Sequence, residues 1–302
     1  MSPKTGMIGL GQMGRGMALN LHRKTAGIPV FDMSDKAKDQ LAQAGATPVQ
    51  SAADLAKTCD IIILCLPTDQ EAETALFGPN GVVAGQCSNS ILIDTTTMDR
   101  NATLKLADRA AKAGLTYCDC PVSGLPQRAE DGTLTAMFGG AKENFEHLKP
   151  LLLTFSKTVL YCGGVGSGQA MKAVSNIIYN INIAALCEVL PLAVAAGLDP
   201  QQLAQLVTSG SSSSFASGHF VPRMLARDFS AYFPLQKATK DIVNIQQMQA
   251  ETDAIVPLAT AMIASYNAAL SASHRAEPKT AMLKPYEAAL NIQYKSTKRN
   301  SP

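Results

Sequence analysis

The sequence predicts an α/β fold in which an N-terminal doubly wound sheet and an all-α C-terminal domain are joined by a long helix. Two observations support this prediction. In the first half, short apolar runs such as Ile61 to Leu66 and Ile91 to Asp94 alternate with segments of helical spacing. Continuous apolar runs are typical of parallel strands that are buried on both faces. After Tyr161 the strand pattern stops and helical segments follow, so the second half is predicted to be helical.

Each element of this fold has its own signal in the sequence. The expected strands are Met7 to Leu10, one that ends at Val30 and Phe31, Ile61 to Leu66, Ile91 to Asp94, and one that ends at Asp119. The expected helices are Met13 to Lys24, a long helix from Gly168 to about Ala196, and three near Pro200 to Val207, Leu235 to Ala250 and Pro257 to Leu270. The serine run Ser211 to Ser214 is predicted to be a loop.

The length of the chain suits two domains, and its composition excludes several classes of function. With 302 residues, 46% of them hydrophobic, the chain can bury more than one core. We place the domains at residues 1–164 and 165–302, where the strand pattern stops. The net charge is +2 and the basic residues are dispersed, so no nucleic-acid surface is expected. The apolar stretch Ile177 to Cys187 contains polar residues, which predicts a buried helix and no membrane span.

The seven cysteines are predicted to be reduced thiols. None belongs to a Cys-x-x-Cys pair, and a reducing compartment is expected. Cys118 and Cys120 lie two residues apart in an expected strand and therefore point to one face, but no histidine-rich segment accompanies them, so no metal site is expected. Since the N-terminus leads directly into the first strand and shows no secretory signal, we expect a cytoplasmic location.

A glycine-rich turn follows the first expected strand and opens the first expected helix. It contains Gly9, Leu10, Gly11, Gln12, Met13 and Gly14 in a G-x-G-x-x-G pattern. Glycines at this spacing permit a tight turn, a close approach of the backbone to a pyrophosphate, and tight packing of helix on strand. The helix N-terminus adds free N–H groups that favour an anion. The first domain is therefore predicted to be a Rossmann domain that binds a dinucleotide.

Asp32 stands at the end of the second expected strand, 18 residues after Gly14. An acid near this offset accepts hydrogen bonds from the ribose hydroxyls of NAD and repels the 2′-phosphate of NADP. The neighbouring sequence has a second acid, Asp35, and no arginine. The predicted cofactor is therefore NAD.

The long helix carries a narrow polar stripe. Between Gly168 and Leu192 its only charged residues are Lys172 and Glu188, and Asn176 and Asn180 share the helix face of Lys172. A lysine in an apolar helix is costly unless it is paired or used in chemistry. A snorkelling lysine beside structural asparagines explains the stripe equally well.

Two other segments contain candidate residues whose patterns are weak when taken alone. The pair Ser123 and Gly124 follows a strand end and a sharp turn, where a hydroxyl and backbone N–H groups could meet a carboxylate. The pair Lys240 and Asp241 lies on a helix and could be an ordinary surface ion pair.

Four motifs, in order along the chain, resemble those of the β-hydroxyacid dehydrogenases, the family of 3-hydroxyisobutyrate dehydrogenase and tartronate semialdehyde reductase. They are Gly9 to Gly14 with Met17 to Leu21, Asp119 to Gly124 with Gly132 to Leu134, Gly166 to Asn176, and Lys240 to Ile242. The resemblance implies a helical domain like that of 6-phosphogluconate dehydrogenase and hydride transfer between NAD(H) and a small β-hydroxy acid or semialdehyde. Homodimers or homotetramers are also implied, and the apolar helix faces of the second half favour them.

The resemblance also implies roles for single residues. Lys172 would be the general acid/base, and desolvation beside a positive nicotinamide would favour its neutral form. The substrate would be held by Asn176, Ser123 and the backbone of Gly124. The nicotinamide half of the cofactor would be contacted by Leu66, Pro67, Thr96, Thr97 and Lys240.

The sequence departs from the family pattern at two places. Leu125 and Pro126 stand where a second glycine usually follows Ser-Gly, and the region Ser273 to Pro285 lacks the usual Gly-x-x-Asp element. Both departures concern the identity of the substrate. Two alternatives are kept, an imine-reductase-like enzyme, which usually has another residue in place of Lys172, and a non-catalytic dinucleotide-binding protein.

Overall fold

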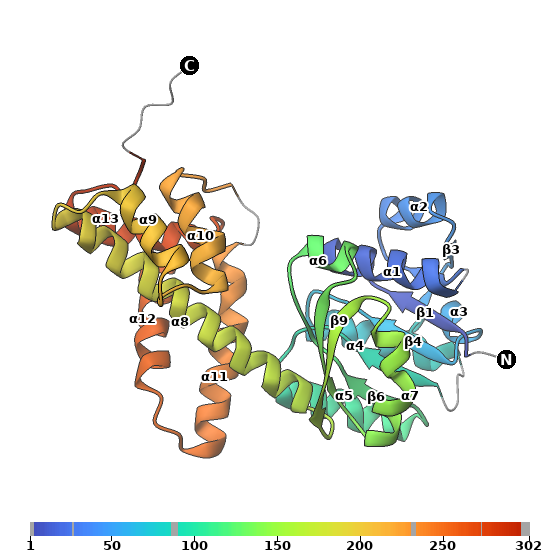
Figure 1. The fold of residues 1–302 in the computed structure, drawn as a ribbon. Helices are drawn as coiled ribbons and strands as arrows, with labels where there is room; N and C mark the ends of the chain where they lie inside the picture. Colours follow the sequence, from blue (N-terminus) through green and yellow to red (C-terminus); the bar gives the residue numbers. More distant parts are fainter. Residues whose placement is uncertain (1–2, 26, 86–89, 231–233, 273, 297–302) are drawn as a thin grey trace. The chain divides into compact units, whose positions relative to one another are not determined.

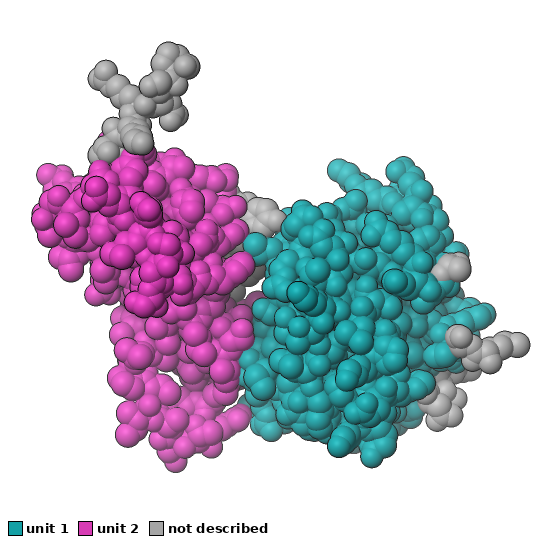
Figure 2. All heavy atoms as spheres, in the orientation of Figure 1, with its two compact units in different colours: residues 1–172 teal, residues 173–302 magenta. Residues whose placement is uncertain are grey.

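The structure is a computed structural model that describes residues 3–25, 27–85, 90–230, 234–272 and 274–296. The chain forms two compact units, residues 1–172 and 173–302 (Figure 2). The division falls inside helix α8 (Ser167–Ala195), whose first turns belong to the first unit. The domain boundary proposed from the sequence, at 164/165, lies just before this helix.

The first unit is built on one mixed β-sheet (Figure 1). Its parallel strands are β1 (Thr5–Ile8), β2 (Pro29–Phe31), β3 (Thr47–Pro48), β4 (Ile61–Leu64), β5 (Ile91–Asp94) and β6 (Thr116–Asp119). They lie in the order β3-β2-β1-β4-β5-β6, the order of a Rossmann dinucleotide-binding fold. Three further strands, β7 (Val122–Ser123), β8 (Leu134–Gly139) and β9 (Ser156–Gly163), extend the sheet, and β8 runs antiparallel to both β6 and β7.

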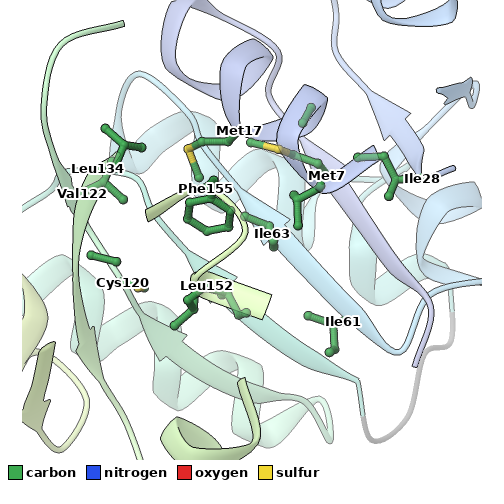
Figure 3. Close-up of a cluster of buried hydrophobic side chains, with 14 of the residues drawn as sticks. Met7, Met17, Ile28, Ile61, Ile63, Cys120, Val122, Leu134, Leu152 and Phe155 are labelled. Atoms are coloured by element: carbon green, nitrogen blue, oxygen red, sulfur yellow. The ribbon is translucent and has the colours of Figure 1, made fainter. Parts of the chain in front are cut away.

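Helices cover both faces of this sheet, as the continuous apolar strands predict. They are α1 (Gln12–Thr25), α2 (Asp35–Gln43), α3 (Ala52–Ala56), α4 (Asp69–Phe77), α5 (Arg100–Lys112), α6 (Pro126–Glu130) and α7 (Lys142–Leu152), with a short 3-10 helix at Val82–Gly85. Figure 3 shows the core on one face, where Met7 and Ile63 meet Met17 of α1 and Leu152 of α7. The alternate strand residues, such as Ile62, pack into a second core on the opposite face.

Helices form the second unit in the part of the chain described, apart from a single bridge between Pro234 and Pro278. After α8 come α9 (Pro200–Ser209), α10 (Phe215–Leu225), α11 (Thr239–Thr252), α12 (Pro257–Ser271) and α13 (Leu283–Leu290), with 3-10 turns η2 (Leu235–Ala238) and η3 (Lys279–Met282). Their core includes Ile183 of α8 and Tyr266 of α12. This confirms the expected all-α second half.

Helix α8 is buried on one face only, whereas the sequence predicts a buried helix. Its length and the mean hydropathy of 1.8 over its most apolar 18 residues would suit a membrane span by composition, and 33% of this window is buried in the protein. Ile183, Cys187 and Leu190 enter the core of the second unit. Apolar side chains of the other face, Ile178 and Leu192 among them, remain more than half exposed.

Candidate active site

The glycine-rich turn connects β1 to α1 at the carboxyl end of the parallel sheet. Gly9 has φ 93°, and a Cβ there would lie 2.3 Å from the carbonyl oxygen of Cys65. A Cβ on Gly14 would lie 2.0 Å from the carbonyl oxygen of Gly9, whereas a Cβ on Gly11 would meet nothing within 4 Å. The first and third glycines therefore allow close packing, and the second leaves open space where a pyrophosphate can approach the backbone. Leu10 lies on this turn, and Gln12 and Met13 begin α1.

Asp32 lies directly beside this turn. Its Oδ2 accepts a hydrogen bond from the backbone N–H of Leu10 at 2.6 Å, and its Oδ1 accepts one from Ser34 at 2.8 Å. The backbone N–H of Gly9 also donates to the carbonyl of Phe31 at 2.9 Å. These bonds fix the half-buried carboxylate at the end of β2, next to the open space at Gly11.

The segments that follow β4 and β5 are held together by Thr96. Its hydroxyl accepts from the N–H of Leu66 at 3.0 Å, and its own N–H donates to Asp94 Oδ1 at 2.9 Å. The second oxygen of Asp94 accepts from the hydroxyl of Tyr117 at 2.7 Å. Burial raises the pKa of Asp94, and these hydrogen bonds oppose the rise. Two of the predicted nicotinamide-side residues are thus in direct contact, while Pro67 is exposed and Thr97 half-buried.

The Ser123–Gly124 turn forms the edge of the sheet extension. Ser123 pairs with Thr135 of β8. Gly124 has φ 145°, which strongly favours glycine, and a Cβ there would lie 2.6 Å from Leu134 Cδ2, so that the leucine side chain would have to shift. Leu125 is extended, with φ −93° and ψ 166°, as expected for a residue before proline.

The start of helix α8 is held by the buried carboxylate of Asp119. Oδ1 accepts from the N–H of Gly166 at 2.6 Å, and Oδ2 accepts from the N–H of Gln169 at 2.8 Å. These are N–H groups that a helix N-terminus leaves without intrahelical partners. Burial raises the pKa of Asp119 to about 6, the two backbone hydrogen bonds oppose that rise, and the nearby charge of Asp94 adds to it. The end of β6 therefore fixes the first turn of α8.

Gln169 and two glycines complete this attachment. The side-chain nitrogen of Gln169 donates to the carbonyl of Thr96 at 2.7 Å, and its oxygen accepts from the N–H of Met98 at 3.3 Å. A Cβ on Gly168 would lie 2.3 Å from the carbonyl oxygen of Met137, and one on Gly139 would lie 2.4 Å from Asp119 Oδ1. Larger residues at either position would push the helix away from the sheet. Lys172 is half-buried and begins one turn after this fixed point.

A second cluster lies in the second unit, around Asp241. Asn176 and Asn180 of α8 donate to its two carboxylate oxygens at 2.8 and 3.1 Å. Lys240, the neighbour of Asp241 on α11, is half-buried. Because only 6% of Asp241 is exposed, it is a buried residue and not part of the ordinary surface ion pair that the sequence alone allowed.

Two family models match consecutive parts of the chain. The NAD-binding domain of 6-phosphogluconate dehydrogenase matches residues 4–164, and the NAD-binding part of NADP-dependent 3-hydroxyisobutyrate dehydrogenase matches residues 166–286. The 2-(hydroxymethyl)glutarate dehydrogenase of Eubacterium barkeri is 34% identical over 80% of each chain. The chain belongs to the β-hydroxyacid dehydrogenase family. It is an oxidoreductase that transfers hydride with a nicotinamide dinucleotide.

Other members of the family extend the similarity. The 2-hydroxy-3-oxopropionate reductase of Escherichia coli (strain K12) is 35% identical over 79% of this chain and 82% of its own. The solved structure of Mycobacterium tuberculosis 3-hydroxyisobutyrate dehydrogenase with L-serine is 25% identical, with a TM-score of 0.81 over 94% of this chain and 99% of that chain. These comparisons show the fold and the class of chemistry for this β-hydroxyacid dehydrogenase.

The structure adds residues to which sequence reasoning gave no role in this β-hydroxyacid dehydrogenase. Asp119 opens the substrate motif, yet its function in fixing α8 depends on partners 47 and 50 positions away. The available signal was an acid at the end of a buried strand, which has to find donors. Gln169 and Asp241 were likewise part of motifs without a role of their own. Their partners, too, come from distant segments.

Proposed function

We propose that this dehydrogenase oxidises a small β-hydroxy acid to its semialdehyde, or reduces the semialdehyde, with NAD(H) and with Lys172 as the general acid/base. The observation that carries the proposal is the attachment of α8. Asp119 ties its first turn to the end of β6, and Gln169 ties it to the segment after β5. In a Rossmann fold, ligands bind at these carboxyl ends of the strands. Lys172 follows one turn later on the same helix.

The proposed chemistry divides between cofactor and protein. The bound nicotinamide accepts or supplies the hydride. In oxidation, the neutral amine Nζ of Lys172 takes the hydroxyl proton of the substrate, and in reduction its ammonium returns a proton to the carbonyl oxygen. A hydroxyl from Ser123 and the backbone N–H of Gly124 bind the substrate carboxylate, and Asn176 holds the substrate one helical turn beyond Lys172. Lys240 contacts the nicotinamide side of the cofactor.

We propose NAD as the preferred cofactor. Support comes from the carboxylate of Asp32, which two backbone N–H groups hold beside the glycine-rich turn. A fixed negative charge at this place accepts hydrogen bonds from ribose hydroxyls and repels a 2′-phosphate. The exposed Asp35 follows closely and adds to the repulsion.

We also propose that the protein is a homodimer or homotetramer. The exposed face of α8 in the second unit carries Val174, Ile178, Ala185, Val189 and Leu192, which recur at helical spacing. Val174 is 43% exposed and the other three large side chains are 53–57% exposed. A continuous apolar stripe of this kind supports contact with a second copy. A cytoplasmic location is proposed from the free thiols of the six described cysteines.

The test of the proposed reaction is Lys172→Ala, assayed with 3-hydroxyisobutyrate, 3-hydroxypropionate, 2-(hydroxymethyl)glutarate and 2-hydroxy-3-oxopropionate. Loss of a general acid/base should lower kcat about 10²–10⁴-fold while the affinity for NAD, from fluorescence titration, stays within about twofold of the wild type, well below a one-hydrogen-bond effect. Lys142→Ala, on α7, is the matched control. Near-normal turnover of Lys172→Ala would refute the role of Lys172.

The wild type, assayed with the same compounds and a cyclic imine, tests the two alternatives. A cyclic imine reduced faster than every acid would favour the imine-reductase alternative. No turnover of any compound would favour the non-catalytic alternative.

A further inference from the structure

A buried chain of polar groups runs through the second unit from α8 to η3. Asn180 is fully buried, and it connects the carboxylate of Asp241 to the ammonium group of Lys279. The amide nitrogen of Asn180 donates to Asp241 Oδ2 at 3.1 Å. Its amide oxygen accepts from Lys279 Nζ at 2.6 Å and from the hydroxyl of Tyr266 at 2.8 Å. The other oxygen of Asp241 accepts a hydrogen bond from the amide nitrogen of Asn176 at 2.8 Å.

The chemistry of the partners fixes the direction of each amide in this chain. An ionised carboxylate only accepts hydrogen bonds, and an ammonium group only donates them. Asn180 therefore cannot reverse its amide without placing donor against donor at Lys279 and acceptor against acceptor at Asp241. Asn176 has to turn its nitrogen towards Asp241 for the same reason. Its carbonyl oxygen and its second N–H are then left in one defined orientation.

Two opposite charges are buried in this chain, one on each side of Asn180. Asp241 is 6% exposed and Lys279 is 5% exposed, and an isolated charge at either position would be strongly unfavourable. The faces of Tyr179 and Tyr266 also lie near the ammonium group, with Nζ 4.9 and 5.9 Å from the ring centroids. Burial first, and then the negative charge of Asp241, raise the pKa of Tyr179. Asn180 bonds to both groups and so links the two buried charges.

Lys279 lies in the segment Ser273 to Pro285, where the sequence departs from the family pattern. At that place this chain has a buried lysine whose amine reaches the amide of Asn180, 99 positions away. Where the sequence departs from the family pattern, this chain therefore has a lysine that bonds to the face of α8 that carries Asn176.

We propose that Asp241 and Lys279 are positioning residues for the substrate-holding amide of Asn176. Asp241 orients this amide by a direct hydrogen bond, and Lys279 acts through Asn180 as the buried counter-charge that keeps Asp241 in place. This rests on the proposed function in one respect, the contact of Asn176 with the substrate. Neither residue touches the reacting atoms. Their effect is to reduce the orientational freedom that Asn176 would otherwise lose on binding substrate.

The experiment is a double-mutant cycle with Asn176→Ala and Lys279→Met, using the panel substrate that the wild type turns over with the highest kcat/KM. Each single variant should raise KM by about tenfold or more, the effect of a lost hydrogen bond to a charged or fixed partner, with a smaller change in kcat. Because Lys279 acts through Asn176, the double variant should have the KM of Asn176→Ala alone. Lys279→Arg should recover part of the loss.

A second readout does not depend on substrate. The side-chain NH₂ signal of Asn176, assigned by its absence in Asn176→Ala, should be protected from solvent exchange in the wild type and lose protection in Lys279→Met. Asn180→Leu, which interrupts the chain while leaving both charges, should have the same effect. Lys284→Met is the matched control, since this lysine pairs with Glu277 in the same segment and lies outside the chain. Thermal unfolding identifies any variant that fails to fold.

The outcomes separate the two proposals. Unchanged KM in Asn176→Ala would refute the substrate contact assigned to Asn176, and the NMR signal would still test its positioning. Raised KM in Asn176→Ala with additive effects of Lys279→Met would overturn the positioning role. So would an Asn176 signal that stays protected in both Lys279→Met and Asn180→Leu.

Discussion

The side chain of Asp32 contacts the glycine-rich turn. It is also the residue that we expect to decide between NAD and NADP. Its two oxygens accept from the backbone of Leu10 and of Ser34, so the carboxylate shapes the turn in addition to the ribose contact that we propose for it. Removing it therefore has two consequences, a looser turn and a lost negative charge. Asp32→Asn loses the charge but keeps one of the two acceptor oxygens, so it should loosen the turn less than Asp32→Ala does.

For cofactor preference we predict that the wild type has the higher kcat/KM with NAD, and that Asp32→Ala and Asp32→Asn both lower the NAD/NADP ratio. The lost hydrogen bonds from the ribose should cost about 10–100-fold with NAD, as expected for bonds to a charged acceptor. Asp35→Asn serves as the control and should change the ratio far less. A wild type that prefers NADP would contradict the assignment.

Helix α8 depends at its first turn on the buried carboxylate of Asp119. Burial raises the pKa of Asp119 from 3.8 to about 6. Between these values the folded state holds a proton that the unfolded state releases, so stability falls as pH rises. The contribution is fully present below pH 3.8 and is lost as pH rises through about 6; it amounts to about 3 kcal/mol.

The variant that tests this is Asp119→Asn, which removes the titration while nearly keeping the shape. We expect the wild type to lose stability relative to the variant between pH 4 and pH 7, with most of the change between pH 4 and pH 6. The free energy of unfolding in urea, measured at each pH for both proteins, gives the difference. A difference that is constant across this range would mean that Asp119 titrates at its ordinary pKa.

Helices and strands could be predicted where the residues that determine them are close together in the sequence. The strands at Ile61 and Ile91 and the helices α8, α9 and α12 were confirmed to within a few residues, because apolar spacing and caps such as Asp199 are encoded nearby. Helix α10 was not predicted, since Gly218 and Pro222 interrupt its helical pattern. The two-residue strand β7 exists through its pairing with β8, and β8 itself also pairs with β6 and β9.

The candidate site also contains both residues that the local sequence predicts and contacts that it does not. The glycine-rich turn and Asp32 could be predicted, and the structure places them together. The contacts of Asp119 and Asp241 join segments 47 to 65 positions apart, and nothing in the local sequence specifies such partners. Roles for Lys172, Ser123, Gly124, Asn176 and Lys240 stay predictions, which the proposed variants test.

The exposed apolar stripe of α8 predicts that the protein associates with copies of itself. A chain of 31.8 kDa should give a mass of two or four chains by light scattering. Ile178→Glu combined with Leu192→Glu should shift the mass towards one chain, because a buried interface does not tolerate unpaired carboxylates. Leu153→Glu, at an exposed apolar position of the first unit, is the control. A wild type that remains at 31.8 kDa at high concentration would contradict the prediction.

Helix α8 also restricts how members of this family can be recombined. Its first turn is bonded to Asp119 and Thr96, and its third and fourth turns are bonded to Asp241 through Asn176 and Asn180. A crossover in the loop before Gly166 would give the helix start and Asp119 to different parents, and one after Asn180 would separate the asparagines from Asp241. Crossovers between Gln169 and Asn176 leave both networks intact. Functional chimaeras should therefore join inside the helix, although a loop would be the usual choice.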